Sequence, residues 1–217
     1  MTHIFVIRTA HDAGTQYSSQ FTNSLVRKAS QTFIVKIIER DNLDGNYIRS
    51  MLTQHKPKFV FYNGHGSPDS WWHKSRGQEI PLLTSNDSPL FKDKVIFARA
   101  CDSLSNMGEK AIENNCKAYI GYDKEFSFPM TDGYASRPEH DPIAGPVFKA
   151  SNIVAEKLLD GRTVEESIKA SHDYADAEFN KLIYRIEDDP FANAILTFLV
   201  PNDVFLDFKG DPQETIC

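Results

Sequence analysis

Short apolar runs alternate with amphipathic segments along the first 121 residues of the chain. An apolar run bounded by polar or turn residues is typical of a strand that is buried on both faces. Five runs fit this pattern, at residues 4–7, 33–38, 58–62, 94–98 and 117–121. Between the first two runs, apolar residues recur every four positions and predict an amphipathic helix; they are Tyr17, Phe21, Leu25 and Ala29. Asp44 is placed to cap a further helix, which Pro57 bounds.

This alternation of strands and helices predicts an α/β fold. We expect a three-layer α-β-α sandwich around a mostly parallel, doubly wound sheet of about six strands. The apolar run at 194–200 predicts the last strand. Asn106 with Glu109, and Thr163 with Glu166, match the capping-box pattern with which helices begin.

Two stretches, 67–93 and 122–140, show neither the helical nor the strand pattern and are expected to be irregular loops. The adjacent Trp71 and Trp72 favour a wall beside a crevice over disorder. The sequence contains no internal repeat and no Pro/Gly-rich linker, so residues 1–217 are expected to form a single domain.

The net charge of −6, with no Lys/Arg-rich run, argues against direct binding of nucleic acid. No apolar stretch reaches the roughly 20 residues that cross a bilayer, and the first residues lack the basic flank of a signal peptide. The three cysteines form neither a CxxC pair nor an even framework, which is typical of a reducing cytoplasm. A cytoplasmic protein without membrane contact is therefore expected.

No metal and no organic cofactor are expected. Four candidate ligands have spacings that match no usual zinc pattern: they are His65, His73, Cys101 and Cys116. The GxGxxG motif that begins at Gly64 has Asp69 in place of its last glycine, which argues against dinucleotide binding.

Two of the predicted strands end beside reactive side chains. His65 lies in the stretch YNGHGS at 62–67, and Cys101 lies in the stretch ARACDS at 98–103. Consecutive strands of a parallel sheet usually lie side by side, and their carboxyl ends open into one crevice. We therefore expect His65 and Cys101 to face each other at one edge of the sheet.

A thiol that follows a strand and precedes a helix N-terminus is favoured as thiolate. A neighbouring histidine stabilises that thiolate as imidazolium and later protonates a leaving amine. The backbone N–H groups of Gly66 and Cys101 are candidate oxyanion donors. No third, orienting residue is evident, although Asn63 and Asp102 are candidates. The competing interpretation is an inert buried cysteine and a plain Gly-His-Gly loop, which the pairing at matching strand ends disfavours.

The YNGHGS and ARACDS stretches resemble the His-Gly and Ala-Cys blocks of the caspase-like (clan CD) cysteine peptidases. That group includes caspases, legumains, gingipains, separases and bacterial CHAT domains, and in it the histidine ends one sheet strand and the cysteine ends the next. The sequences of the two stretches are closer to the gingipain, separase and CHAT branches. The caspase signature has Gln where Arg99 stands, so the aspartate choice of caspases is not implied. The resemblance covers residues 1–121 by element order. It implies His65 as general acid/base, Cys101 as nucleophile and Gly66 as oxyanion donor.

The resemblance also implies where a substrate side chain binds: beside the residues that flank the cysteine, and on the loops after the first and fifth strands. The charged residues at those places are Arg8, Arg99, Asp102, Asp123, Lys124 and Glu125. Arg8 and Arg99 would suit an acidic substrate residue through bidentate pairing; the carboxylates would suit a basic one, and solvated loop charges are the other interpretation. Trp71 and Trp72 are candidates for a further subsite, or plain packing residues.

These features predict a cysteine endopeptidase that cleaves a protein or peptide substrate through an acyl-enzyme at Cys101. We expect control by an activating or inhibitory protein partner or by the chain's own loops, and the CHAT resemblance suggests a role in bacterial defence or cell-death signalling. The alternatives are a catalytically silent caspase-like interaction module and another α/β thiol hydrolase. The intact His65 and Cys101 argue against the first, and the missing G-x-C-x-G elbow argues against the second.

Overall fold

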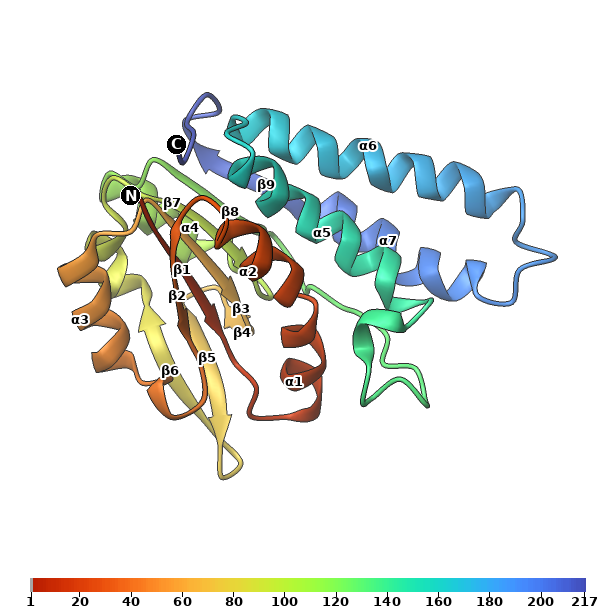
Figure 1. Ribbon diagram of the computed structural model, residues 1–217, viewed down its shortest axis with the longest axis horizontal. Coiled ribbons are helices and arrows are strands. Elements are labelled where there is room, and N and C mark those ends of the chain that lie inside the picture. The colour runs from red at the N-terminus through yellow and green to blue at the C-terminus, as the bar shows by residue number, and fades with distance from the viewer. Residues whose placement is uncertain (1) are drawn as a thin grey trace.

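A six-stranded sheet forms the centre of the computed structural model, which describes residues 2–217 (Figure 1). The strand order is β2-β1-β3-β7-β8-β9, and every pair is parallel except β8 with β9. The strands are β1 (His3–Arg8), β2 (Ile34–Ile38), β3 (Phe59–Asn63), β7 (Val95–Arg99), β8 (Ala118–Tyr122) and β9 (Leu206–Gly210). The five strands expected in the first half of the chain are thus confirmed, in a mostly parallel sheet.

The sixth strand was predicted wrongly. Residues 194–200 belong to a helix, α7 (Ala192–Phe205), and the antiparallel edge strand β9 follows it. A short apolar run fits a buried helix as well as a buried strand, because periodicity alone does not separate the two. In α7 the run buries Ile195, Leu196 and Leu199 along one side against other helices.

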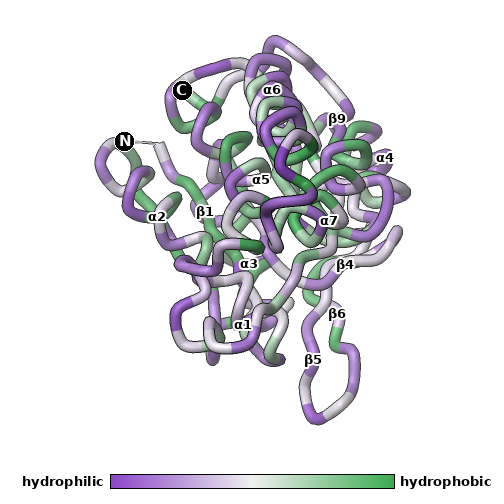
Figure 2. Tube along the Cα trace, turned by 90° about the vertical axis from the view of Figure 1, so that its right-hand side faces the viewer, coloured by the Kyte–Doolittle hydropathy of each residue, from purple (hydrophilic) through white to green (hydrophobic). Residues whose placement is uncertain are grey.

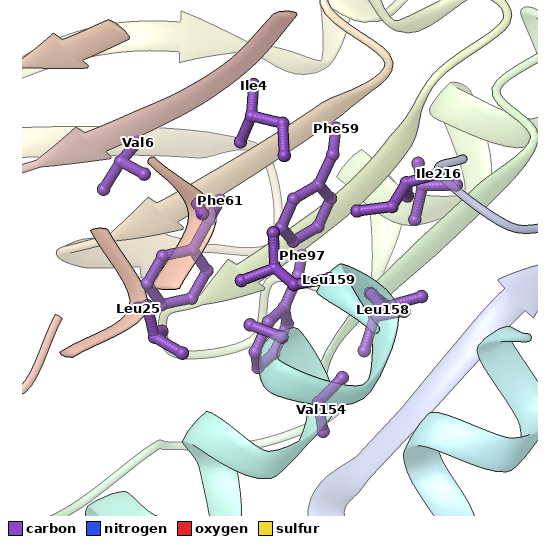
Figure 3. Packing of buried hydrophobic residues seen from close by; sticks show 14 of the residues in the cluster. Ile4, Val6, Leu25, Phe59, Phe61, Phe97, Val154, Leu158, Leu159 and Ile216 are labelled. Carbon is purple, nitrogen blue, oxygen red and sulfur yellow. The ribbon is translucent and has the colours of Figure 1, made fainter. Parts of the chain in front are cut away.

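Alternate residues of the central strands serve two separate cores. Phe59 and Phe61 of β3 face a core with α1 (Ala13–Gln20), α2 (Asn23–Ala29) and α5 (Ala144–Leu159), as the close view in Figure 3 shows for the strand and α5 side chains. Val60 and Tyr62 face the opposite core, which α3 (Gly45–His55) and α4 (Asn106–Glu113) cover. Helices therefore cover both faces of the sheet, an arrangement compatible with a three-layer α-β-α sandwich.

Two long C-terminal helices pack outside this arrangement. Helix α6 (Val164–Ile183) and α7 pack on α5 around a third apolar cluster, and the turn between them projects away from the sheet (Figure 1). Among the helices of residues 2–217, none combines the length and the apolar character needed to cross a membrane.

Residues 67–93 are ordered rather than irregular, contrary to expectation. They form most of a three-stranded antiparallel sheet, β4 (His65–Ser67), β5 (Ser70–Ser75) and β6 (Gln78–Thr84), followed by the 3-10 helix η2 (Ser85–Phe91). Pro81 lies in β6, an edge strand, where a missing N–H is tolerated. The hairpin tip turns at Arg76 and Gly77, both with positive φ, and is hydrophilic in Figure 2.

Helix ends also differ in part from expectation. The stripe at 17–29 is divided into α1 and α2, and α1 begins at a capping box formed by Asp12 and Thr15. The capping boxes expected at the later helices have different outcomes. Thr163 and Glu166 form the expected capping box. The box expected from Asn106 and Glu109 is not formed, because Asn106 is the first residue of α4 and the N-cap, Ser105, makes no side-chain cap hydrogen bond. Apart from Tyr122, which ends β8, and the short 3-10 helix η3 (Pro138–His140), residues 122–140 are irregular, as expected of a loop.

Candidate active site

The register of the sheet sets His65 and Cys101 at the same level. Asn63 at the end of β3 pairs with Arg99 at the end of β7, and the two reactive residues each follow two positions later. Both side chains line one cavity of about 230 Å³. The two strand ends are in close contact, because a Cβ added to Gly66 would lie only 2.6 Å from the Cys101 carbonyl oxygen. The sequence-based expectation that these residues share one crevice is therefore confirmed.

An aspartate that the sequence analysis missed holds the histidine. His65 Nε2 lies 2.5 Å from Asp12 Oδ2. The other carboxylate oxygen of Asp12 accepts the Thr15 N–H at 2.9 Å, as the N-cap of α1. Burial opposes ionisation of Asp12, but its hydrogen bonds with Thr15 and His65 outweigh burial and lower its pKa. An ionised Asp12 makes Nε2 the hydrogen-bearing nitrogen, which leaves the lone pair of Nδ1 free to accept a proton.

Neither of the two residues considered as a third catalytic group holds the His65 ring among residues 2–217. The Asn63 side chain bonds Ser18 and Arg99, and the His65 ring bonds Asp12 rather than Asp102. The signal for Asp12 was its position as an N-cap directly after the first strand, at the carboxyl edge of the sheet.

The adjacent tryptophans separate into two roles. The Trp72 ring stacks on the His65 imidazole, with centroids 4.2 Å apart and planes 9° apart, because the two residues pair across β4 and β5. Trp71 is fully buried, stacks on Tyr62 and donates its indole N–H to the Tyr119 hydroxyl. Trp71 therefore lies in the core rather than in a substrate subsite. Trp72 is not among the residues that line the Cys101 cavity either, but its ring fixes the plane of the imidazole.

Cys101 does not lie at a helix N-terminus. Turn residues separate it from α4, which begins at Asn106, so the expected stabilisation of a thiolate by the helix is absent. Burial raises the pKa of the Cys101 thiol, and the negative charges of Glu125 and Asp102 act in the same direction. The thiol lies 3.8 Å from the Phe126 carbonyl oxygen, as a weak donor. A neutral thiol at physiological pH follows, so a base must remove its proton for it to act as a nucleophile.

One backbone donor beside the Cys101 thiol is available to a ligand. The Cys101 N–H has no backbone acceptor among residues 2–217, and the Gly66 backbone packs against it. An unpaired N–H beside a thiol is a candidate donor to an oxyanion.

Arg99 is buried beneath this cavity, with 1% of its surface exposed. Its Nε donates to Asn63 Oδ1 and its Nη1 to Asn152 Oδ1, each at 2.7 Å. Burial lowers the pKa of Arg99 to about 10, so the side chain remains charged at neutral pH. The guanidinium also stacks on aromatic rings, those of Phe61, Phe126 and Phe148.

The other charged candidates are dispersed. Arg8 pairs with Glu39 at 2.5 Å and bonds Thr22 and Asn23, and it does not line the Cys101 cavity. Asp102, Asp123 and Lys124 also lie outside the lining of that cavity, whereas Glu125 is part of it. Sequence reasoning missed further lining residues, for which the pattern carries no signal: Gly14, Thr15, Ser18, Phe126, Ser127 and Phe128.

Neither the family models nor the curated proteins with which the chain was compared give a match, so the roles of these residues depend on their geometry and on the motif resemblance.

Proposed function

We propose that the protein is a cytoplasmic cysteine endopeptidase of the caspase-like type, with Cys101 as nucleophile and His65 as general acid/base. The observation that carries the proposal is the paired register of β3 and β7, which brings His65 and Cys101 to one cavity while Asp12 holds the far side of the imidazole. The motif resemblance supports it, since the histidine and the cysteine end neighbouring strands in that group.

The first half of the reaction forms an acyl-enzyme. His65 Nδ1 takes the Cys101 thiol proton as Sγ attacks the carbonyl carbon of the substrate, and the C=O electron pair moves onto oxygen. The N–H groups of Cys101 and Gly66 donate to that oxyanion. When the C–N bond breaks, the leaving nitrogen takes the proton from His65, and a thioester remains on Sγ.

The second half restores the enzyme. A water molecule attacks the thioester carbon while His65 accepts one of its protons. The C–S bond then breaks, Sγ recovers a proton from His65, and the carboxylic acid product leaves. Asp12 stabilises the imidazolium in both halves without itself taking a proton, which is the part an orienting carboxylate plays.

The test is covalent labelling by a panel of peptidyl acyloxymethyl ketones, read by intact mass. The panel carries acidic, basic or apolar residues next to the reactive ketone. We expect one adduct on the wild-type chain, none on Cys101→Ala and a rate at least tenfold lower on His65→Ala.

Cys217 offers a matched control, because it is the exposed cysteine of the chain. Cys217→Ala should label as wild type does. Adducts that persist in Cys101→Ala and disappear in Cys217→Ala would reveal non-specific alkylation and would count against the proposed function. So would a complete lack of Cys101 adducts with every member of the panel.

A further inference from the structure

Arg99 brings a buried positive charge to the wall of the cavity beside Cys101. Both of its side-chain acceptors, Asn63 and Asn152, are neutral amides. Within residues 2–217, no carboxylate lies at ion-pair distance from its guanidinium, and Nη2 is buried without any hydrogen-bond partner.

A buried ion normally has a counter-ion, because leaving water is costly for an unpaired charge. The aromatic rings that stack on Arg99 offset part of this cost and hold its plane fixed. They provide no acceptor for the free Nη2 hydrogens. Arg99 is therefore arranged as half of an ion pair whose other half is missing from the described chain.

We propose that Arg99 binds the acidic side chain, aspartate or glutamate, of the substrate residue whose carbonyl Cys101 attacks. This inference rests on the proposed function. The residue acylated on Sγ has its side chain closest to Cys101, and the cavity there is lined by Arg99 as well as by His65. Its volume of about 230 Å³ accommodates one carboxylate side chain, since a water molecule takes about 30 Å³.

The other charges near the cavity do not reverse this choice. Glu125 lines the cavity but is exposed, so its charge is screened by solvent. A basic side chain that entered the cavity would meet the buried guanidinium of Arg99. Arg8, the other arginine considered for substrate binding, is already paired with Glu39 outside the cavity.

The decisive experiment measures kcat/KM of the wild-type chain on peptide pools that differ only in the residue before the cleaved bond. Each pool fixes that residue as Asp, Asn, Glu, Gln, Arg or Leu and randomises its neighbours. We expect the better acidic pool to exceed its amide counterpart by about 100-fold, because the amide leaves the Arg99 charge unpaired. Cys101-dependent cleavage with equal rates for acid and amide, or with Arg or Leu preferred, would overturn the inference and leave the proposed function standing.

Binding to the inactive Cys101→Ala chain gives a readout that needs no cleavage. Acetylated peptide amides that contain Asp or Asn at the same position are titrated by calorimetry. Tighter binding of the Asp peptide, by at least tenfold, supports the inference even if no pool is cleaved, a result that would count against the proposed function alone. Equal or undetectable binding of both peptides would overturn the inference.

Two arginine variants test which arginine causes the preference for an acidic residue. Arg99→Gln should reduce the acid-to-amide ratio to within a few-fold of unity, whereas Arg8→Gln should keep it. An Arg99→Gln chain that folds, as judged by circular dichroism and Tm, and retains the acidic preference would overturn the assignment to Arg99. If Arg99→Gln does not fold, the wild-type pools and the binding titration still decide the question.

Discussion

Asn63 and Arg99 pair across neighbouring strands, and Arg99 Nε donates to Asn63 Oδ1 at 2.7 Å. The pair lies two residues before His65 and Cys101, so the register that joins the two polar side chains also sets the level of the two reactive ones. A slip of one residue would turn every side chain of a strand to the other face of the sheet. The relative position of Cys101 and His65 is therefore a property of the sheet rather than of the loops.

Asp12→Asn should lower kcat on the order of 10²-fold and change KM little, because an amide does not stabilise the imidazolium as a carboxylate does. Asparagine caps a helix about as well as aspartate, so α1 should keep its N-terminus. Steady-state kinetics, with kcat and KM measured separately, test this expectation. An unchanged kcat would show that Asp12 does not position His65 for the reaction.

The same variant has a signature in stability against pH. The pKa of Asp12 is lowered in the folded chain, so the stability it contributes is present at neutral pH and is lost as the pH falls through that lowered value. We expect urea unfolding to show wild type more stable than Asp12→Asn at pH 7 and the difference to shrink at pH 3. A difference that does not vary with pH would contradict this reasoning.

Alkylation of Cys101 by iodoacetamide should be slow at pH 7 and should increase toward alkaline pH. Burial raises the pKa of the thiol, and only the thiolate reacts. The half-maximal rate is expected above pH 8.5, the value of an ordinary cysteine. Peptide mapping over a series of pH values follows Cys101 and the exposed Cys217 in the same sample. If Cys101 reached its half-maximal rate at a lower pH than Cys217, a pre-formed thiolate would be indicated and the neutral-thiol mechanism would be contradicted.

The two adjacent tryptophans should respond differently to truncation. Trp71→Ala removes a fully buried side chain and should cost about 3–5 kcal/mol of unfolding free energy. Trp72→Ala removes the ring that stacks on His65 and should lower kcat more than stability, with Trp72→Phe restoring most of the activity. Denaturant unfolding and kinetics on the three variants separate the two roles. Equal losses of stability in Trp71→Ala and Trp72→Ala would argue against the division.

Gly66→Ala should reduce both stability and activity, because the added Cβ would lie 2.6 Å from the Cys101 carbonyl oxygen and 2.7 Å from the Ala100 Cβ. Overpacking of this kind costs about 1–3 kcal/mol, and displacement of an oxyanion donor costs about 10²–10³ in kcat. Gly145→Ala is the matched control, since a Cβ there meets no atom within 4 Å. Wild-type kinetics in Gly66→Ala would contradict the close approach of the two strand ends.

The local pattern of apolar and polar residues was sufficient to predict most strands of the central sheet. The five apolar runs of the first half became β1, β2, β3, β7 and β8, because strands buried on both faces need continuous apolar sequence. The same pattern placed His65 and Cys101 at matching strand ends. It failed at 194–200, where a helix and a strand bury an apolar run equally well. It also failed at 67–93, where prolines and polar residues interrupt the pattern of a second, three-stranded sheet.

Only the tertiary structure decided the chemistry around those two residues. Asp12 is 53 residues from His65, and Asn152 is 53 residues from Arg99, so neither contact follows from local sequence. Burial, which depends on how distant segments pack, made the Cys101 thiol neutral and left Arg99 Nη2 without a hydrogen-bond partner among residues 2–217. The sequence by itself determined five strands of the central sheet and the reactive side chains that follow two of them. Long-range packing determined which partners those side chains have and which charges they carry.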